Sequence, residues 1–101
     1  MADLKQAILM NEKDNVAIVL AQIRNGERVQ VVFNKEIVVE VTALEDIETY
    51  HKIAIRPIQD GDIVYKYGEI IGKAVCSIRV GQHVHIDNIE SVMVGNESQS
   101  V

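Results

Sequence analysis

A short pattern that occurs three times with the same spacing constrains this chain more than any other feature. An apolar residue is followed four positions later by Ile, three positions after that by Gly, and three positions after that by Val. The copies run from Val19 to Val29, from Ala54 to Val64 and from Ala74 to Val84, and each is named after its first residue. Each copy places an apolar residue before a turn, a Gly where the backbone is expected to have a positive φ, and an apolar strand after it. The pattern therefore predicts one local unit that the fold uses three times.

The repeat and the composition together predict the fold class. The copies are unevenly spaced along the chain, which excludes a solenoid. Hydrophobic residues make up 48% of the chain but aromatic residues only 4%, so the apolar content is mostly Val, Ile, Leu and Ala. Because β-branched side chains are stiff in helices and pack well on pleated surfaces, this composition favours strands. We expect an all-β domain of bent hairpins over residues 1–94, with one or two short helical turns at most and a disordered tail at 95–101.

Turn signals divide the chain into short apolar segments. Asn25-Gly26 and Asp60-Gly61 are strong turn signals, and Asn34-Lys35-Glu36 separates two apolar runs that we expect to form a hairpin. Residues 16–23 fit either a short helix or a buried strand, and residues 43–50 are expected to be a connector with at most one helical turn. The segments expected to be extended are 7–10, 29–33, 37–41, 51–55, 63–67, 70–78, 83–86 and 89–94.

Charge and composition exclude several classes of function. The formal net charge is −5 and aromatic residues are few, so the chain lacks both the basic patch and the stacking platforms of a nucleic-acid-binding protein. One cysteine excludes an internal disulfide. There is no secretory signal and no apolar run of membrane-spanning length, so we expect a cytoplasmic protein that does not bind membranes. A domain of 101 residues buries a modest core, which leaves room for a larger partner or a homo-oligomer.

The stretch from Gly81 to Asn88 contains two of the three histidines. If it continues as a strand, His83, His85 and Asp87 lie on one face, because alternate residues point to the same side. Two imidazoles and a carboxylate on one face can bind a divalent metal or transfer a proton. The alternative is a solvated polar face, because a short His-x-His motif has low specificity.

Only the Ala74 copy carries histidines beside its last Val. The matching positions are Arg28 and Gln30 in the Val19 copy, and Ile63 and Tyr65 in the Ala54 copy. The repeated unit therefore accounts for the Gly and Val of this stretch but not for its histidines, which favours a functional role for them.

The ordered series of motifs resembles the small SAF-type domain of the altronate/galactarate dehydratase family. The resemblance covers roughly residues 6–92. It rests on the repeat, on the opening Asp14-Asn15-Val16-Ala17, and on four further motifs: His51-Lys52-Ile53-Ala54, Tyr65-Lys66-Tyr67-Gly68, Ile71-Gly72-Lys73-Ala74 and Gly81-Gln82-His83-Val84-His85-Ile86-Asp87-Asn88.

This resemblance implies a β-clip fold that works beside a much larger catalytic domain. Members of the family dehydrate sugar acids such as altronate or galactarate and need a divalent metal, usually iron. We therefore expect the small subunit of a hydro-lyase, inactive alone, with Fe²⁺ or Mn²⁺ held mainly by the large subunit. A sulfolactate sulfo-lyase, which eliminates sulfite instead of water, has a small subunit of the same kind and stays open as an alternative. A non-enzymatic module that binds carbohydrate or assembles with itself is a second alternative.

The resemblance also selects candidate site residues. His83 and His85 are the expected catalytic residues and candidate metal ligands, unless they only dock the large subunit. Asn88, His51 and Lys66 are the expected substrate-binding residues. Their structural alternatives are a turn cap for Asn88, a strand-entry histidine for His51 and a solvated cation for Lys66. Asp87 replaces the third histidine of the family pattern, and because a carboxylate does not transfer protons in the same way near neutral pH, no such role is carried over to it.

Overall fold

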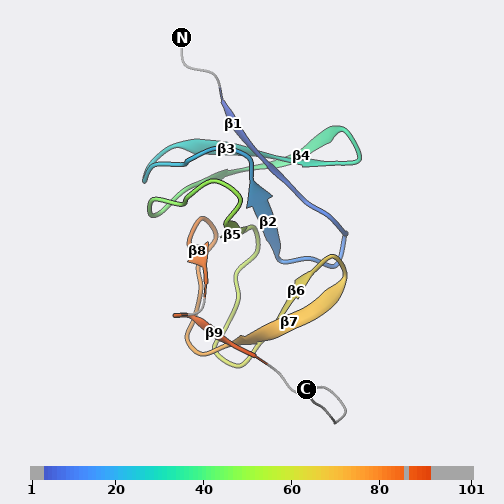
Figure 1. Cartoon of the computed structure of the whole chain (residues 1–101), viewed down its shortest axis with the longest axis vertical. Helices are drawn as coiled ribbons and strands as arrows, with labels where there is room; N and C mark the ends of the chain where they lie inside the picture. Colours follow the sequence, from blue (N-terminus) through green and yellow to red (C-terminus); the bar gives the residue numbers. More distant parts are fainter. Residues whose placement is uncertain (1–3, 86, 92–101) are drawn as a thin grey trace.

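The computed structural model describes residues 4–85 and 87–91, and in these residues all regular structure is β (Figure 1). This confirms the predicted all-β, SAF-like fold. No helix in the described part of the chain is long and apolar enough to cross a membrane. The nine strands within it are β1 (Lys5–Ile8), β2 (Val16–Val19), β3 (Arg28–Phe33), β4 (Glu36–Thr42), β5 (Lys52–Ala54), β6 (Ile63–Lys66), β7 (Glu69–Ala74), β8 (His83–Val84) and β9 (Ile89–Glu90).

The structure settles the ambiguous segments. Residues 16–19 form a strand, so the helical alternative for residues 16–23 was wrong. The connector at 43–50 contains no helical turn, which agrees with the prediction of at most one. The last expected strand, at 89–94, is seen only as β9, since Ser91 is described but not part of a strand. Residues 92–94 and the expected tail at 95–101 lie outside the described residues.

The strands form two sheets. The larger sheet has the order β4-β3-β1-β2-β5-β8, and the smaller one has the order β6-β7-β9. Strands β1 and β3 are parallel, and all other described pairs are antiparallel. The predicted β3–β4 hairpin is present and turns through Asn34 and Lys35, both with positive φ. Strands β4 and β8 are thus the two opposite edges of the larger sheet.

The structure contains a fourth copy of the repeat that the sequence pattern missed. Residues Ala43, Ile47, Tyr50 and Ile53 have the same spacing, and the three apolar members are fully buried like those of the other copies. Tyr50 stands where the other copies have Gly, with a φ of 70° against 92° to 97° for the glycines. The pattern requires Gly and Val where this copy has Tyr50 and Ile53, so it does not include the Ala43 copy.

The four copies interlock in two pairs. The Val19 and Ala43 copies share an antiparallel bridge between Ile23 and Ile47, and the Ala54 and Ala74 copies share the matching bridge between Ile58 and Ile78. The residue at the glycine position of each copy donates its N–H to the first residue of the paired copy. These bonds are Gly26 to Ala43 at 2.8 Å, Tyr50 to Val19 at 2.8 Å, Gly61 to Ala74 at 2.8 Å and Gly81 to Ala54 at 2.9 Å. The repeats therefore form two similar halves, residues 19–53 and residues 54–84.

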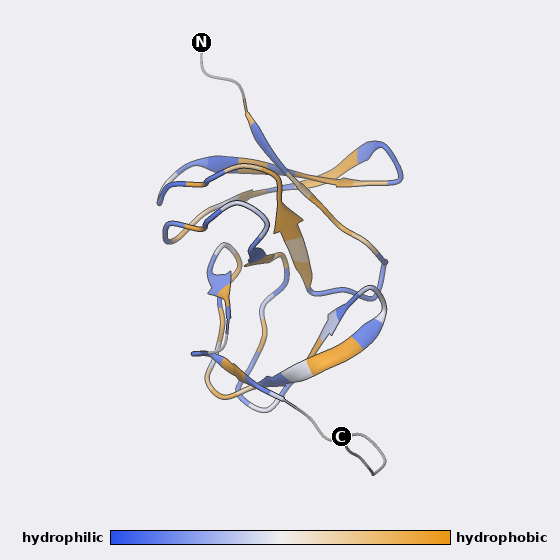
Figure 2. Cartoon of the chain, in the orientation of Figure 1, coloured by the Kyte–Doolittle hydropathy of each residue, from blue (hydrophilic) through white to orange (hydrophobic). Residues whose placement is uncertain are grey.

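Each half has its own hydrophobic cluster. The first gathers the apolar positions of the Val19 and Ala43 copies with those of β1, β3 and β4, and the second gathers those of the Ala54 and Ala74 copies. Strand β2, orange in Figure 2, joins them, because Val19 belongs to the first cluster and Val16 to the second. Full burial of each Val or Ile side chain contributes about 1.5–3 kcal/mol, so these positions hold the fold together.

A polar pair, Asp14 and Asn15, ties the β1–β2 loop to the β6–β7 hairpin. Asp14 is fully buried, and its two carboxylate oxygens accept the N–H groups of Tyr67 at 2.8 Å and Gly68 at 2.7 Å. The amide of Asn15 both donates to and accepts from the backbone of β6. Asp14 and Asn15 therefore stabilise the contact between two segments that are distant in the sequence.

Candidate functional site

The histidine stretch does not continue as a strand. Strand β8 ends at Val84, so the prediction that His83, His85 and Asp87 share one face of a strand was wrong. Asn88 ends the strand, because its Oδ1 accepts the N–H of His85 at 2.9 Å and its Nδ2 donates to the carbonyl of His83 at 2.7 Å. The turn still stacks the rings of His83 and His85, with centroids 4.3 Å apart.

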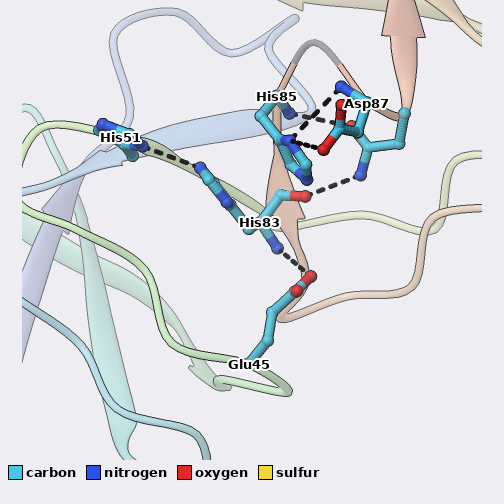
Figure 3. Close-up of polar contacts among 6 residues, drawn as sticks. Glu45, His51, His83, His85 and Asp87 are labelled. Atoms are coloured by element: carbon cyan, nitrogen blue, oxygen red, sulfur yellow. Dashed lines mark hydrogen bonds and ion pairs between the residues drawn. The ribbon is translucent and has the colours of Figure 1, made fainter.

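Strand pairing brings the third histidine to the other two. Strand β5 pairs with β8 so that Lys52 lies opposite Val84 and Ile53 opposite His83, which brings His51, just before β5, close to the histidine turn. The Nδ1 of His51 is 2.9 Å from the Nε2 of His83, within hydrogen-bonding distance (Figure 3). Residues 32 positions apart in the sequence thus form one cluster of three imidazoles.

The repeated unit shows why His51 is free to make this contact. In the other three copies, the residue after the glycine uses its side chain to accept a backbone N–H three residues earlier. These bonds run from Arg24 to Glu27 at 2.7 Å, from Gln59 to Asp62 at 2.9 Å and from Arg79 to Gln82 at 2.6 Å. His51 holds the equivalent place in the Ala43 copy, but its ring contacts His83 instead. His51 therefore lacks the side-chain bond of the repeated unit, and it lies at the pocket.

Burial keeps His83 neutral near neutral pH. Desolvation lowers the pKa of the His83 imidazole, and the charges of His85, His51 and Lys52 lower that pKa further. Glu45 opposes this shift; its Oε2 also accepts the backbone N–H of His83 at 2.9 Å. A neutral imidazole has one free lone pair and one N–H, so His83 can accept a proton and can donate a hydrogen bond.

The imidazoles line an open cavity of about 540 Å³. Lys52 is half-buried in its wall, and desolvation followed by the charge of Lys66 lowers the pKa of its ammonium group. Imidazole donors and a partly desolvated cation suit a ligand with a carboxylate and hydroxyl groups. The lining residues are Tyr50, His51, Lys52, His83, Val84, His85, Asp87 and Ile89. Sequence reasoning missed Lys52 and Tyr50, although Lys52 stood in the quoted motif beside His51.

Two predicted substrate-binding residues lie elsewhere. The Nζ of Lys66 sits over the ring of Tyr67, 5.1 Å from its centroid, and Lys66 is absent from the pocket lining. Asn88 is 9% exposed, and both polar atoms of its side-chain amide hydrogen-bond to the backbone of the histidine turn. This geometry matches the turn-cap alternative for Asn88, and direct contact of either residue with a substrate stays a prediction.

The described side chains do not form a complete metal site. Among residues 4–85 and 87–91, no three His, Cys, Asp or Glu side chains are arranged to hold an ion. The facing nitrogens of His51 and His83 are at hydrogen-bonding distance, and Asp87 reaches only the Nδ1 of His85, at 3.4 Å. The role of His83 and His85 as metal ligands therefore stays a prediction.

A second cavity, of about 360 Å³, lies near β4 and is mainly apolar. Its one cation, Arg56, donates to the backbone carbonyls of Asp14 and Glu12. Because that guanidinium already hydrogen-bonds to the protein backbone, the histidine pocket is the better candidate site.

Comparison with known proteins agrees with the fold and with the motifs. Residues 5–92 match the family described as the altronate/galactarate dehydratase SAF domain. The chain is 34% identical over 88 residues to an altronate dehydratase of Bacillus subtilis (strain 168), which is 87% of this chain and 17% of that relative. It is 40% identical over 83 residues to an altronate dehydratase of Escherichia coli (strain K12), which is 82% of this chain and 16% of that relative.

A shorter relative matches part of the chain. The alpha subunit of (2R)-sulfolactate sulfo-lyase from Paracoccus pantotrophus is 45% identical over 51 residues, which is 50% of this chain and 76% of that subunit. The chain spans about one sixth of the length of the altronate dehydratases it matches but most of this sulfo-lyase subunit.

Proposed function

Because the chain belongs to the altronate/galactarate dehydratase SAF domain family, we propose that it is the small subunit of a lyase that removes water from a hydroxy acid. A larger, separate catalytic subunit completes the enzyme in this proposal. The similarity to a sulfo-lyase alpha subunit supports the separate form, since that relative is by name one subunit of an enzyme.

The observation that carries the proposal is the meeting of His51, His83 and His85 with Lys52 around one open cavity. Removal of water from a hydroxy acid requires a base for the proton at the carbon next to the carboxylate and an acid for the departing hydroxyl. A neutral His83 paired with His51 can carry such a proton, and Lys52 can bind the carboxylate. The pocket supplies these groups to the active site of the large subunit.

We also propose that the enzyme uses a divalent metal, Fe²⁺ or Mn²⁺, held by the large subunit. When bound, such an ion polarises the oxygens of the hydroxy acid and makes the adjacent proton more acidic. The residues described here bind and orient the substrate and exchange its proton. His83 and His85 are not required to hold the ion for this role.

Elimination of sulfite is the second candidate reaction. The 45% identity to the sulfo-lyase alpha subunit favours it, and sulfolactate is also an anionic hydroxy acid that Lys52 can bind. The two reactions share the proton removed beside the carboxylate and differ in the leaving group.

Co-expression with a candidate large chain tests the proposal. We expect a stable complex that converts altronate or galactarate into a keto acid, or (2R)-sulfolactate into a keto acid and sulfite, while the small chain alone is inactive. Metal analysis of complexes with and without the His83→Ala and His85→Ala changes shows whether this chain contributes ligands. Failure to form a complex, together with no turnover of any of the three acids, would refute the proposal. A non-enzymatic module would instead keep its binding or assembly function in the histidine variants.

A further inference from the structure

Tyr50 occupies a backbone conformation that the other three copies give to glycine. Its φ is 70°, a region that costs a residue with a Cβ about 1–2 kcal/mol. A Cβ added at Gly26 or Gly61 would meet no atom within 4 Å, so the φ angle rather than crowding accounts for glycine at those two turns. Glycine in place of Tyr50 would therefore relieve strain in the Ala43 copy.

The fold gains little from the tyrosine side chain. Tyr50 is 71% exposed, and its backbone N–H bond to Val19 would be kept by glycine. The other positive-φ residues besides glycine are Asn34, Lys35 and Tyr67, which lie in the tight turns of the β3–β4 and β6–β7 hairpins, where the turn type itself requires positive φ. Tyr50 alone departs from a glycine that three equivalent turns share.

Its location explains the departure. Tyr50 lines the histidine pocket beside His51 and Lys52. Strained residues held at a cavity are characteristic of binding sites. A phenol can both donate and accept a hydrogen bond, which suits a ligand rich in hydroxyl groups.

We propose that Tyr50 is a substrate-binding residue of this pocket. The phenol hydroxyl bonds a substrate hydroxyl while the ammonium of Lys52 binds the carboxylate. This assignment rests on the proposed function, since it names a further group that contacts the substrate of the same enzyme.

Tyr50→Gly in the assembled two-subunit enzyme tests the assignment. The assay uses whichever of altronate, galactarate or (2R)-sulfolactate the wild-type complex turns over. We expect a higher melting temperature of the small chain, because the strain is relieved, and a KM raised about threefold to tenfold, the worth of one hydrogen bond. The kcat should stay within about twofold, since the phenol takes no part in proton transfer.

Lys35→Gly is the matched control. Lys35 has the same φ of 70° but lies in the β3–β4 turn, at the edge of the larger sheet opposite the pocket. It should raise the melting temperature without changing KM. His83→Ala is the reference for the proposed function.

The outcomes separate the two claims. If His83→Ala lowers activity and Tyr50→Gly leaves KM unchanged, the assignment of Tyr50 is wrong and the proposed function stands. If Tyr50→Gly destabilises the chain, the side chain is structural and the assignment is also wrong. If neither change affects turnover, or the complex turns over none of the three acids, the proposed function itself fails.

Discussion

Two polar clusters in this chain join distant segments, but they differ in the groups that their polar atoms contact. At Asp14 and Asn15, both carboxylate oxygens and both amide atoms bond to the backbone of the β6–β7 hairpin. At His51, His83 and His85, ring atoms meet other rings beside an open cavity. Side chains that bond to backbone hold the fold, whereas side chains that gather around a cavity remain available to a ligand. The expected effects of mutations should follow this division.

Asp14→Ala should have the largest effect, and only on stability. It removes two charge-assisted bonds from a fully buried site, so we expect the free energy of unfolding to fall by about 3 kcal/mol. Urea denaturation measures the loss. Asp14→Asn, which keeps one acceptor oxygen, should lose less. A loss below about 1 kcal/mol for the alanine variant would show that the cluster does not fasten the hairpin.

His83→Ala should show the opposite behaviour. In the proposed function His83 is an acid/base group, so its loss should lower kcat about 100-fold, which corresponds to about 2.7 kcal/mol. The free energy of unfolding should change little, because the side chain is only partly buried. Steady-state kinetics of the assembled enzyme measures the change. Arg28→Ala is the control, because Arg28 holds the same place in the Val19 copy but faces solvent, paired with Glu40. Equal activity of the His83→Ala and Arg28→Ala enzymes would show that the histidine cluster has no functional role that sets it apart from the Asp14 and Asn15 cluster.

Asn88→Ala tests whether Asn88 holds the fold or contacts the substrate. It loses two bonds to the backbone of the histidine turn, so we expect the free energy of unfolding to fall by about 1–2 kcal/mol. Thermal unfolding and steady-state kinetics should be measured on the same preparation. Unchanged stability with a raised KM would instead place the amide in contact with the substrate, as the sequence motif predicted.

The smallest expected effect is on the pH dependence of stability. The pKa of His83 is lowered in the folded chain, so the unfolded chain takes up a proton first, near pH 6.5. The stability that neutral His83 contributes is therefore present above about pH 6.5 and is lost as the pH falls below it. Urea midpoints between pH 7.5 and 5 should fall less steeply for His83→Gln than for wild type. Parallel curves would contradict the lowered pKa.

The sequence predicted most of the local structure, because its turns and strands follow from short-range patterns. The repeat predicted the turns at Gly26, Gly61 and Gly81, which all have positive φ. It missed the Ala43 copy because two residues depart from the pattern, Tyr50 in place of Gly and Ile53 in place of Val. It also extended β8 too far, since alternation cannot show that the Asn88 side chain bonds back to the turn.

The site was harder to predict because it depends on strand pairing. His83 and His85 were selected from their spacing, but the contact of His51 with His83 requires β5 and β8 to be neighbours. Lys52 enters the pocket wall for the same reason. Nothing in a local pattern states which of several short strands will pair.

The pocket lies where the two halves meet, because His51 belongs to residues 19–53 and His83 to residues 54–84. The halves touch through the β5–β8 ladder and where Gly81 accepts the N–H of Leu44 at 2.9 Å, so closely that a Cβ at Gly81 would overlap the carbonyl oxygen of Thr42. Because the pocket lies across this seam, a local opening of the seam takes the pocket apart. The amide protons of this seam should then exchange with solvent when the pocket comes apart, and a bound substrate should slow that exchange.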